Sequence, residues 1–285
     1  MSTARSKRAF DKADGLRSSF ATACYGSAAH IEYVLRLGDN ALVLGQRLAQ
    51  WCGHGPVLEE DIALANIALD LIGQARLLLA HAAKLEGRDR DEDSLAYLRG
   101  AREFRNFTML ELPASGVSSA GAMDPDYAVT IARNFLFSAY QCALWTRLSH
   151  SADAELAAIA EKSLKEARYH FAHAADWIVR FGDGTEESHR RAQQALDALW
   201  PYANEWFAAD EIEAAVSRHD IGVAGAALRE FWLAAVAPTL AEATLATPGD
   251  SAFVSTGRTG LHSEHLDYLL AEMQSLHRAH PGAQW

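Results

Sequence analysis

Cysteine and basic residues are scarce in this sequence, and each scarcity removes a class of protein. The 3 cysteines among 285 residues are widely spaced and include no CxxC pair, which excludes a disulfide scaffold and a CxxC-based zinc or redox motif. This usage fits a reducing cytoplasm, the compartment that we expect. Asp plus Glu outnumber Lys plus Arg by 37 to 26, giving a formal net charge of −11, so no nucleic-acid partner is expected.

Long apolar runs are also missing. No stretch of about 18 apolar residues is uninterrupted, and no signal-peptide-like run opens the sequence, so we expect no membrane partner. Strand-like alternation is nearly absent as well. Apolar residues recur instead at spacings of three and four almost everywhere, which predicts an all-α protein.

Four long helices are predicted, at Tyr33–Trp51, Glu59–Leu85, Pro125–Ser149 and Asp153–Phe181. The links within the two pairs are short and the connection between the pairs is longer, as in a ferritin-like four-helix bundle. Further helices are predicted at 94–99, 102–112, 187–208, 210–218, 226–246 and 262–280, and a loop at 113–123. We therefore expect a single ferritin-like domain over residues 33–285 with additional C-terminal helices, preceded by a mobile extension at 1–32.

A ferritin-like bundle invites a test for a di-iron site. Such a site takes one Glu from each of two helices and a Glu-x-x-His from each of the other two, because residues at i and i+3 share a face. The second helix offers Asp70, but Gly73 stands at i+3 and has no ligand atom. The fourth helix offers Glu166, but Tyr169 stands at i+3, and His170 is displaced by about 100° around the helix.

The first and third helices complete the test. Asp39 lies about as far from the interhelical turn as Asp70 and is its expected counterpart. The third helix contains no Asp and no Glu between Tyr127 and Ser149, so one carboxylate of the site is missing outright. The sequence therefore predicts a degenerate layer without metal. Its expected members are Asp39, Asp70, Gly73, Gln74, Lys162, Glu166, Tyr169 and His170.

Carboxylates left inside a bundle need a cation, a hydrogen bond or a proton. Lys162 lies one turn before Glu166, and Gln74 is i+4 from Asp70. We expect Lys162 to bond Glu166 or Asp70 in the interior, where a metal charge would be, with His170 beside it. The alternative is an exposed i,i+4 pair between Lys162 and Glu166, with carboxylates that are solvated.

Other histidines carry weaker signals. Residues 262–265 (HSEH) resemble a small ligand cluster, but a polar helix N-terminus explains them as well. His170 and His173 are i,i+3 and fit the rim of an amphipathic helix. No phosphate-binding glycine motif or nucleophile elbow is present.

Several motifs follow one another in order along the chain. They are 35–40 (LRLGDN), 51–54 (WCGH), 61–67 (DIALANI), 69–76 (LDLIGQAR), 165–170 (KEARYH), 210–212 (DEI), 260–266 (GLHSEHL), 271–274 (AEMQ) and 281–285 (PGAQW). Together they resemble the C-type subunit family of bacterial phenylacetyl-CoA 1,2-epoxidases, from about residue 33 to residue 285. Residues 1–32 fall outside the resemblance.

The resemblance implies a role in phenylacetate catabolism. The complex of that family is an oxygen-dependent monooxygenase that epoxidises the aromatic ring of phenylacetyl-CoA. Its di-iron centre lies in the A-type subunit, and its reductase draws electrons from NADPH through flavin and iron–sulfur groups. The C-type subunit is a ferritin-like structural partner with no cofactor and no catalytic residue of its own. A homo- or hetero-oligomer is therefore expected.

The resemblance also implies substrate contacts at two segments. The residues concerned are Glu59, Glu60, Asp61 and Ile62, and more weakly Ala214, Ala215 and Val216. Two other functions compete with the structural subunit. One is a self-sufficient metal-dependent oxygenase that uses Asp39, Asp70, Glu166 and His170, and the other is a helical module that binds an acyl-CoA or a protein.

Overall fold

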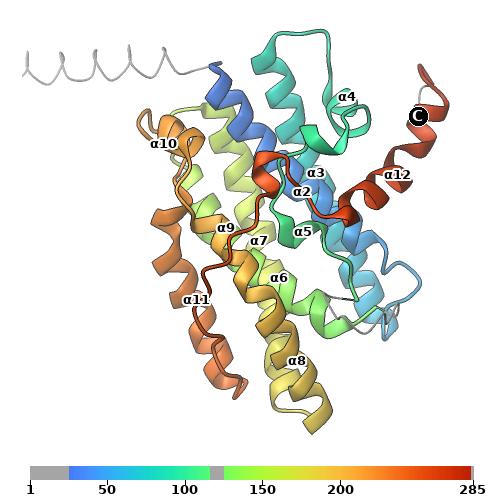
Figure 1. Ribbon diagram of the computed structural model, residues 1–285, viewed down its shortest axis with the longest axis vertical. Helices are drawn as coiled ribbons and strands as arrows, with labels where there is room; N and C mark the ends of the chain where they lie inside the picture. Colours follow the sequence, from blue (N-terminus) through green and yellow to red (C-terminus); the bar gives the residue numbers. More distant parts are fainter. Residues whose placement is uncertain (1–25, 116–124, 284–285) are drawn as a thin grey trace, which may run out of the picture.

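The computed structural model describes residues 26–115 and 125–283, and this part of the chain contains helices and no strand. Four long helices form the bundle, namely α2 (Ala28–Ala49), α3 (Leu58–Glu86), α6 (Tyr127–Leu148) and α7 (Ala154–Gly182) (Figure 1). Helix α2 packs along α3, α6 packs along α7, and α3 joins the two pairs through α7. A short link closes each pair and a longer one connects them, which confirms the predicted ferritin-like bundle.

Side-chain caps set the beginnings of three of these helices, α2, α6 and α7. Helix α2 begins at Ala28, earlier than predicted, because the Ser27 hydroxyl accepts a hydrogen bond from the His30 backbone N–H at 3.2 Å. Residues 28–32 of the predicted extension are therefore helical, and its residues 1–25 lie outside the described residues. Most of the predicted loop at 113–123 lies outside them too.

The connection between the pairs contains α4 (Glu92–Tyr97), η1 (Ala101–Glu103) and α5 (Thr108–Glu111). The continuous helix predicted at 102–112 is wrong. The Arg105 backbone N–H donates to the Asp39 carboxylate at 2.8 Å, and the Phe107 N–H donates to the Asn40 side chain at 2.7 Å. Because α2 supplies these acceptors, residues 104–107 stay extended against it.

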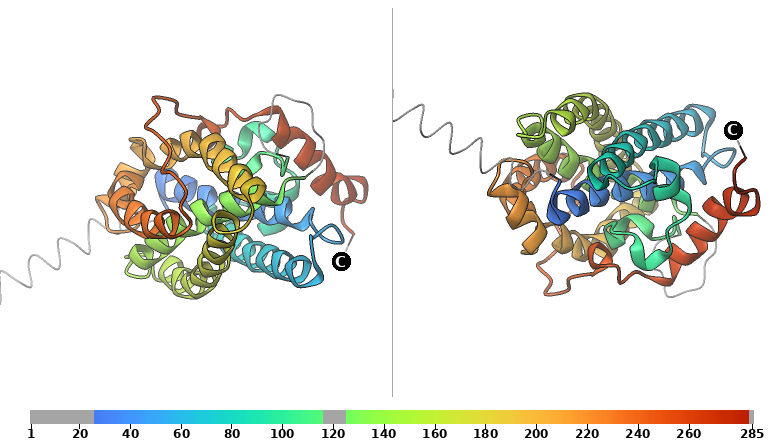
Figure 2. Two further views of the ribbon diagram at one scale, coloured as in Figure 1. Left: turned by 90° about the horizontal axis from the view of Figure 1, so that it is seen from below. Right: turned by 90° about the horizontal axis from the view of Figure 1, so that it is seen from above.

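The C-terminal third wraps the bundle in shorter elements. They are α8 (Glu186–Leu199), η2 (Trp200–Ala203), α9 (Asn204–Phe207), α10 (Glu211–Ser217), η3 (Gly225–Leu228), α11 (Arg229–Glu242), η4 (Gly257–Thr259) and α12 (Glu264–Ala279). The single helix predicted at 187–208 is interrupted, since Pro201 opens the tighter turn η2. Helix α11 packs on α6 and α7, whereas α12 packs on α2, α4 and α5, so the two lie on different sides of the bundle (Figures 1 and 2).

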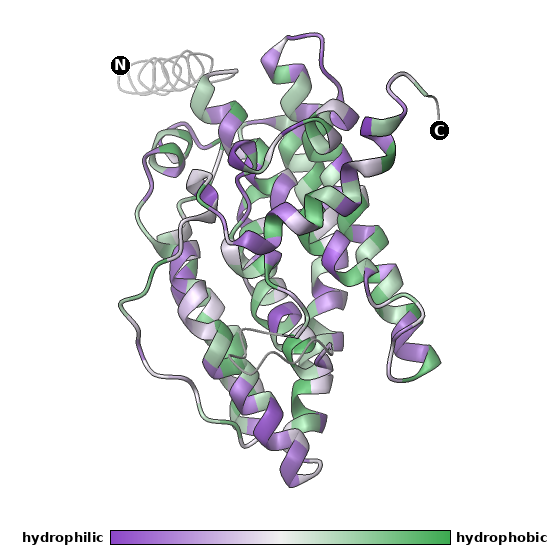
Figure 3. Ribbon diagram, turned by 45° about the vertical axis from the view of Figure 1, so that its right-hand side comes forward, coloured by the Kyte–Doolittle hydropathy of each residue, from purple (hydrophilic) through white to green (hydrophobic). Residues whose placement is uncertain are grey.

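Hydrophobic and hydrophilic residues both occur along the long helices (Figure 3). Helix α3 contains a long apolar stretch. Among the described helices, it alone is long and apolar enough to pass a composition test for a membrane span, a test that buried core helices also pass. It packs on α2, yet leaves large apolar side chains on its outer face, among them Leu69 at 65% exposure.

Candidate functional site

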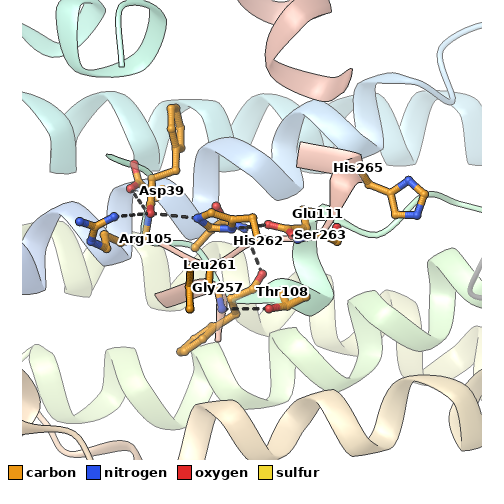
Figure 4. Close-up of polar contacts among 12 residues, drawn as sticks. Asp39, Arg105, Thr108, Glu111, Gly257, Leu261, His262, Ser263 and His265 are labelled. Atoms are coloured by element: carbon orange, nitrogen blue, oxygen red, sulfur yellow. Dashed lines mark hydrogen bonds and ion pairs between the residues drawn. The ribbon is translucent and has the colours of Figure 1, made fainter. Parts of the chain in front are cut away.

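Asp39 does not join the other predicted members of the layer. Its side chain is fully buried and forms an ion pair with the guanidinium of Arg99, which follows α4, and both Asp39 carboxylate oxygens take part. The Arg105 N–H adds a hydrogen bond at 2.8 Å, drawn in Figure 4. The carboxylate thus anchors the crossover segment to α2, and its charge is already neutralised by Arg99.

Two side-chain contacts bridge α3 and α7. His170 Nε2 lies 3.0 Å from Asp70 Oδ2, and the Gln74 amide donates to Glu166 Oε2 at 2.8 Å. Burial lowers the pKa of His170, and this outweighs the raising effect of Asp70, so the imidazole is neutral near pH 7. These residues join α3 to α7 as a hydrogen-bonded seam.

The expected interior position of Lys162 is wrong. Its ammonium lies 3.3 Å from Glu166 Oε1, but the Lys162 side chain is 57% exposed. Asp70 is half-buried at 39%, and Tyr169 points outward at 55% exposure. These residues lie on a rim of the bundle, where an i,i+4 ion pair contributes only about 0.3–0.5 kcal/mol. Lys162 therefore does not replace a metal charge.

The third helix of the bundle, α6, carries a buried arginine and no carboxylate. Arg133 is fully buried, and one of its N–H groups donates to the Leu112 carbonyl. Burial, helped by the charge of Arg47, lowers the pKa of Arg133 to about 9. An iron pair needs several carboxylates that converge, whereas here Asp39 is committed to Arg99 and α6 offers a guanidinium. The predicted layer therefore does not fit a di-iron centre.

The two predicted substrate-contact segments lie apart. Glu60 is buried and accepts hydrogen bonds from Tyr127 at 2.6 Å and His173 at 2.8 Å, which outweigh burial and lower its pKa. Asp61 accepts from the Gly53 N–H at 2.8 Å, while Glu59 and Ile62 face outward. Both carboxylates therefore already have protein partners at the start of α3.

The second segment belongs to α10. Val216 is a buried core residue, Ala215 is half-buried and Ala214 is exposed. Helix α10 packs against α2, where Arg36 pairs with Asp210 at 2.8 Å. Since α3 begins beyond the opposite end of α2, the fold does not bring the two segments together (Figure 1).

His262 is an ion-paired residue of the core. Its Nδ1 lies 2.7 Å from Glu111 Oε2, and its Nε2 lies 3.0 Å from the Phe104 carbonyl oxygen (Figure 4). Burial opposes the charge, but the hydrogen bond and charge of Glu111, with the carbonyl, outweigh it and raise the pKa of His262. Both ring nitrogens therefore donate, and His262 joins the chain before α12 to α5 as an imidazolium.

This pairing predicts a pH dependence of stability. A raised folded-state pKa means that His262 contributes its full stabilisation below its unfolded pKa of about 6.5, and loses it as pH rises through the folded value. We expect the difference in free energy of unfolding between the parent and His262→Gln to be largest near pH 6 and to shrink by pH 9. Urea unfolding at several pH values measures it, and a difference that grows with pH would contradict the pairing.

The sequence did not predict two of the ion-pair partners in this region. Arg99 is 60 positions from Asp39, and Glu111 is 151 positions from His262. No local motif links such distant residues. The available signal was the apolar setting of Arg99, which follows Leu95, Tyr97 and Leu98 and favours a buried, paired guanidinium.

Comparison with known proteins gives two matches. Residues 21–285 match the family model described as phenylacetic acid catabolic protein. The chain is 49% identical over 253 residues to the C-type subunit of 1,2-phenylacetyl-CoA epoxidase from Escherichia coli (strain K12), and the match covers 89% of this chain and 98% of that protein.

Proposed function

Because the chain belongs to the phenylacetic acid catabolic protein family, we propose that it is the non-catalytic structural subunit of a phenylacetyl-CoA-epoxidising monooxygenase. One observation carries the proposal. Asp39, the expected ligand on α2, is committed to Arg99, Gly73 offers no ligand atom, and α6 has the buried Arg133 but no Asp or Glu. The iron and oxygen chemistry then belongs to a separate A-type catalytic subunit, supplied with electrons by a reductase.

A structural subunit needs a surface for its partner. On the outer face of α3, Leu58, Ile62 and Leu69 are 71%, 53% and 65% exposed. They fall within about 40° of one another around the helix and form one row, called the α3 stripe below. Gly73 continues the row and has open space above it. An apolar row of this kind is costly to leave in water, so we assign it to the catalytic subunit.

Reconstitution tests the role of the chain. The purified chain, mixed with reductase, NADPH and phenylacetyl-CoA, should consume no oxygen, and addition of the catalytic subunit should start turnover. Iron analysis of the isolated chain should give far less than one iron per chain. Turnover by the chain with reductase alone would overturn the proposal, as would full activity of the catalytic subunit without this chain.

The reconstitution assay, run with variants of this chain, also locates its contact with the catalytic subunit. Leu69→Glu places a charge in the α3 stripe and should weaken binding of the catalytic subunit about 30-fold, the effect of losing about 2 kcal/mol at an interface hot spot. Leu276→Glu on α12 is the matched control, because Leu276 is 56% exposed and lies outside the stripe. If both variants bind the catalytic subunit equally well, the contact lies on another face of the chain.

A further inference from the structure

Three side chains that the proposed function does not use meet at one end of the bundle. His30 lies in the first turn of α2, His81 near the end of α3, and Asp153 caps the start of α7. His30 Nε2 and His81 Nε2 lie 2.8 and 2.5 Å from the same oxygen, Asp153 Oδ2. All three side chains are at most 1% exposed, and their ligand atoms lie within 4.8 Å of one another.

The donor set is one that proteins use for transition metals. Two imidazole nitrogens with one carboxylate oxygen occur in zinc sites and in non-haem iron sites, with metal–ligand distances of about 2.0–2.2 Å. Asp153 is oriented for this, because its other oxygen, Oδ1, accepts the N–H groups of Glu155 and Leu156 at 3.0 and 3.2 Å. That cap holds Oδ2 toward the two rings.

A second carboxylate supports the His81 ring. Glu155 Oε2 lies 3.3 Å from His81 Nδ1, and Lys84 also pairs with Glu155. His81 Nδ1 forms no hydrogen bond with the described residues, so it can carry the ring proton, facing Glu155, when Nε2 binds metal. His30 differs, because its Nδ1 accepts the Gly26 N–H at 3.1 Å. Metal binding through His30 Nε2 moves the ring proton to Nδ1, so the hydrogen bond from the Gly26 N–H is lost.

We propose that His30, His81 and Asp153 bind one divalent cation of the zinc class. The cation takes the place of the protons that the two Nε2 atoms now direct at Asp153 Oδ2, and those protons leave to solvent or to Nδ1. The site ties together the ends of α2, α3 and α7. It is separate from the α3–α7 seam, since His81 is eleven residues beyond Asp70, about 16 Å along the helix. The proposal does not depend on the proposed function.

Zinc binding by the full-length chain tests this site. Chelator-treated protein, incubated with ZnCl₂ and passed over a desalting column, should retain one zinc per chain by elemental analysis. Its melting temperature should rise with zinc concentration, because the cation binds the folded state. Co²⁺ should give the visible absorption bands of a low-symmetry nitrogen–oxygen site.

Variants separate this site from surface histidines. Asp153→Asn keeps an N-cap side chain but loses the carboxylate, and His81→Gln removes a ring, so each should bind zinc at least tenfold more weakly. His170→Gln is the matched control, since His170 is also buried but lies on the seam, and it should bind like the parent. Circular dichroism checks that each variant folds. No retained zinc and no thermal shift in the parent would overturn the proposal, as would unchanged binding in Asp153→Asn.

Discussion

Replacing Asp39 by asparagine is expected to lower the free energy of unfolding by about 3–5 kcal/mol. The substitution keeps the shape of the side chain but removes its charge, so the Arg99 guanidinium, 4% exposed, remains buried without a counter-ion. It also turns an amide NH₂ toward the N–H donors of Arg99 and Arg105. Urea unfolding followed by circular dichroism gives the value.

Two further variants make this prediction specific. Asp39→Asn combined with Arg99→Met should recover part of the loss, because no uncompensated charge then remains. Glu92→Gln breaks an ion pair in which Arg76 is 76% exposed, and should cost less than about 0.5 kcal/mol. If the free energy of unfolding of Asp39→Asn lies within about 1 kcal/mol of the parent value, the ion pair does not hold the crossover segment as described.

Gly225→Ala is the second substitution with a large expected effect, a loss of about 3 kcal/mol. A Cβ atom at this position would lie 1.9 Å from the Trp206 carbonyl oxygen. That atom belongs to the backbone and cannot move aside as a flexible side chain would. The strain should fall on the contact of η3 with α9, beside the buried Trp206 ring.

Gly73→Ala is the matched control, because a Cβ at position 73 meets nothing within 4 Å. Alanine in the interior of α3 should stabilise the protein by about 0.5–1 kcal/mol, through its higher helix propensity. Thermal melts of the two variants should therefore shift in opposite directions. A Gly225→Ala protein that melts with the parent would show that η3 and α9 can separate at little cost.

The local pattern of apolar residues was sufficient to predict the helical architecture. The spacing of apolar residues predicted four long helices, and the short and long links between them predicted their pairing. The breaks that the prediction missed have tertiary causes. Residues 104–107 have a helical pattern, but α2 offers the side chains of Asp39 and Asn40 as acceptors for their N–H groups. Backbone N–H groups pair with the better acceptor, and here that acceptor lies far away in the sequence.

For the candidate site, the sequence by itself determined which ligands are missing. A glycine at position 73 and a third helix without Asp or Glu cannot supply ligands in any fold. The tertiary structure decided what the remaining charges do. The rotation of α7 places Lys162 in solvent, and the crossover brings Arg99 to Asp39. His30, His81 and Asp153 share no motif, because 51 and 72 residues separate them, and only the packing of three helix ends makes them neighbours.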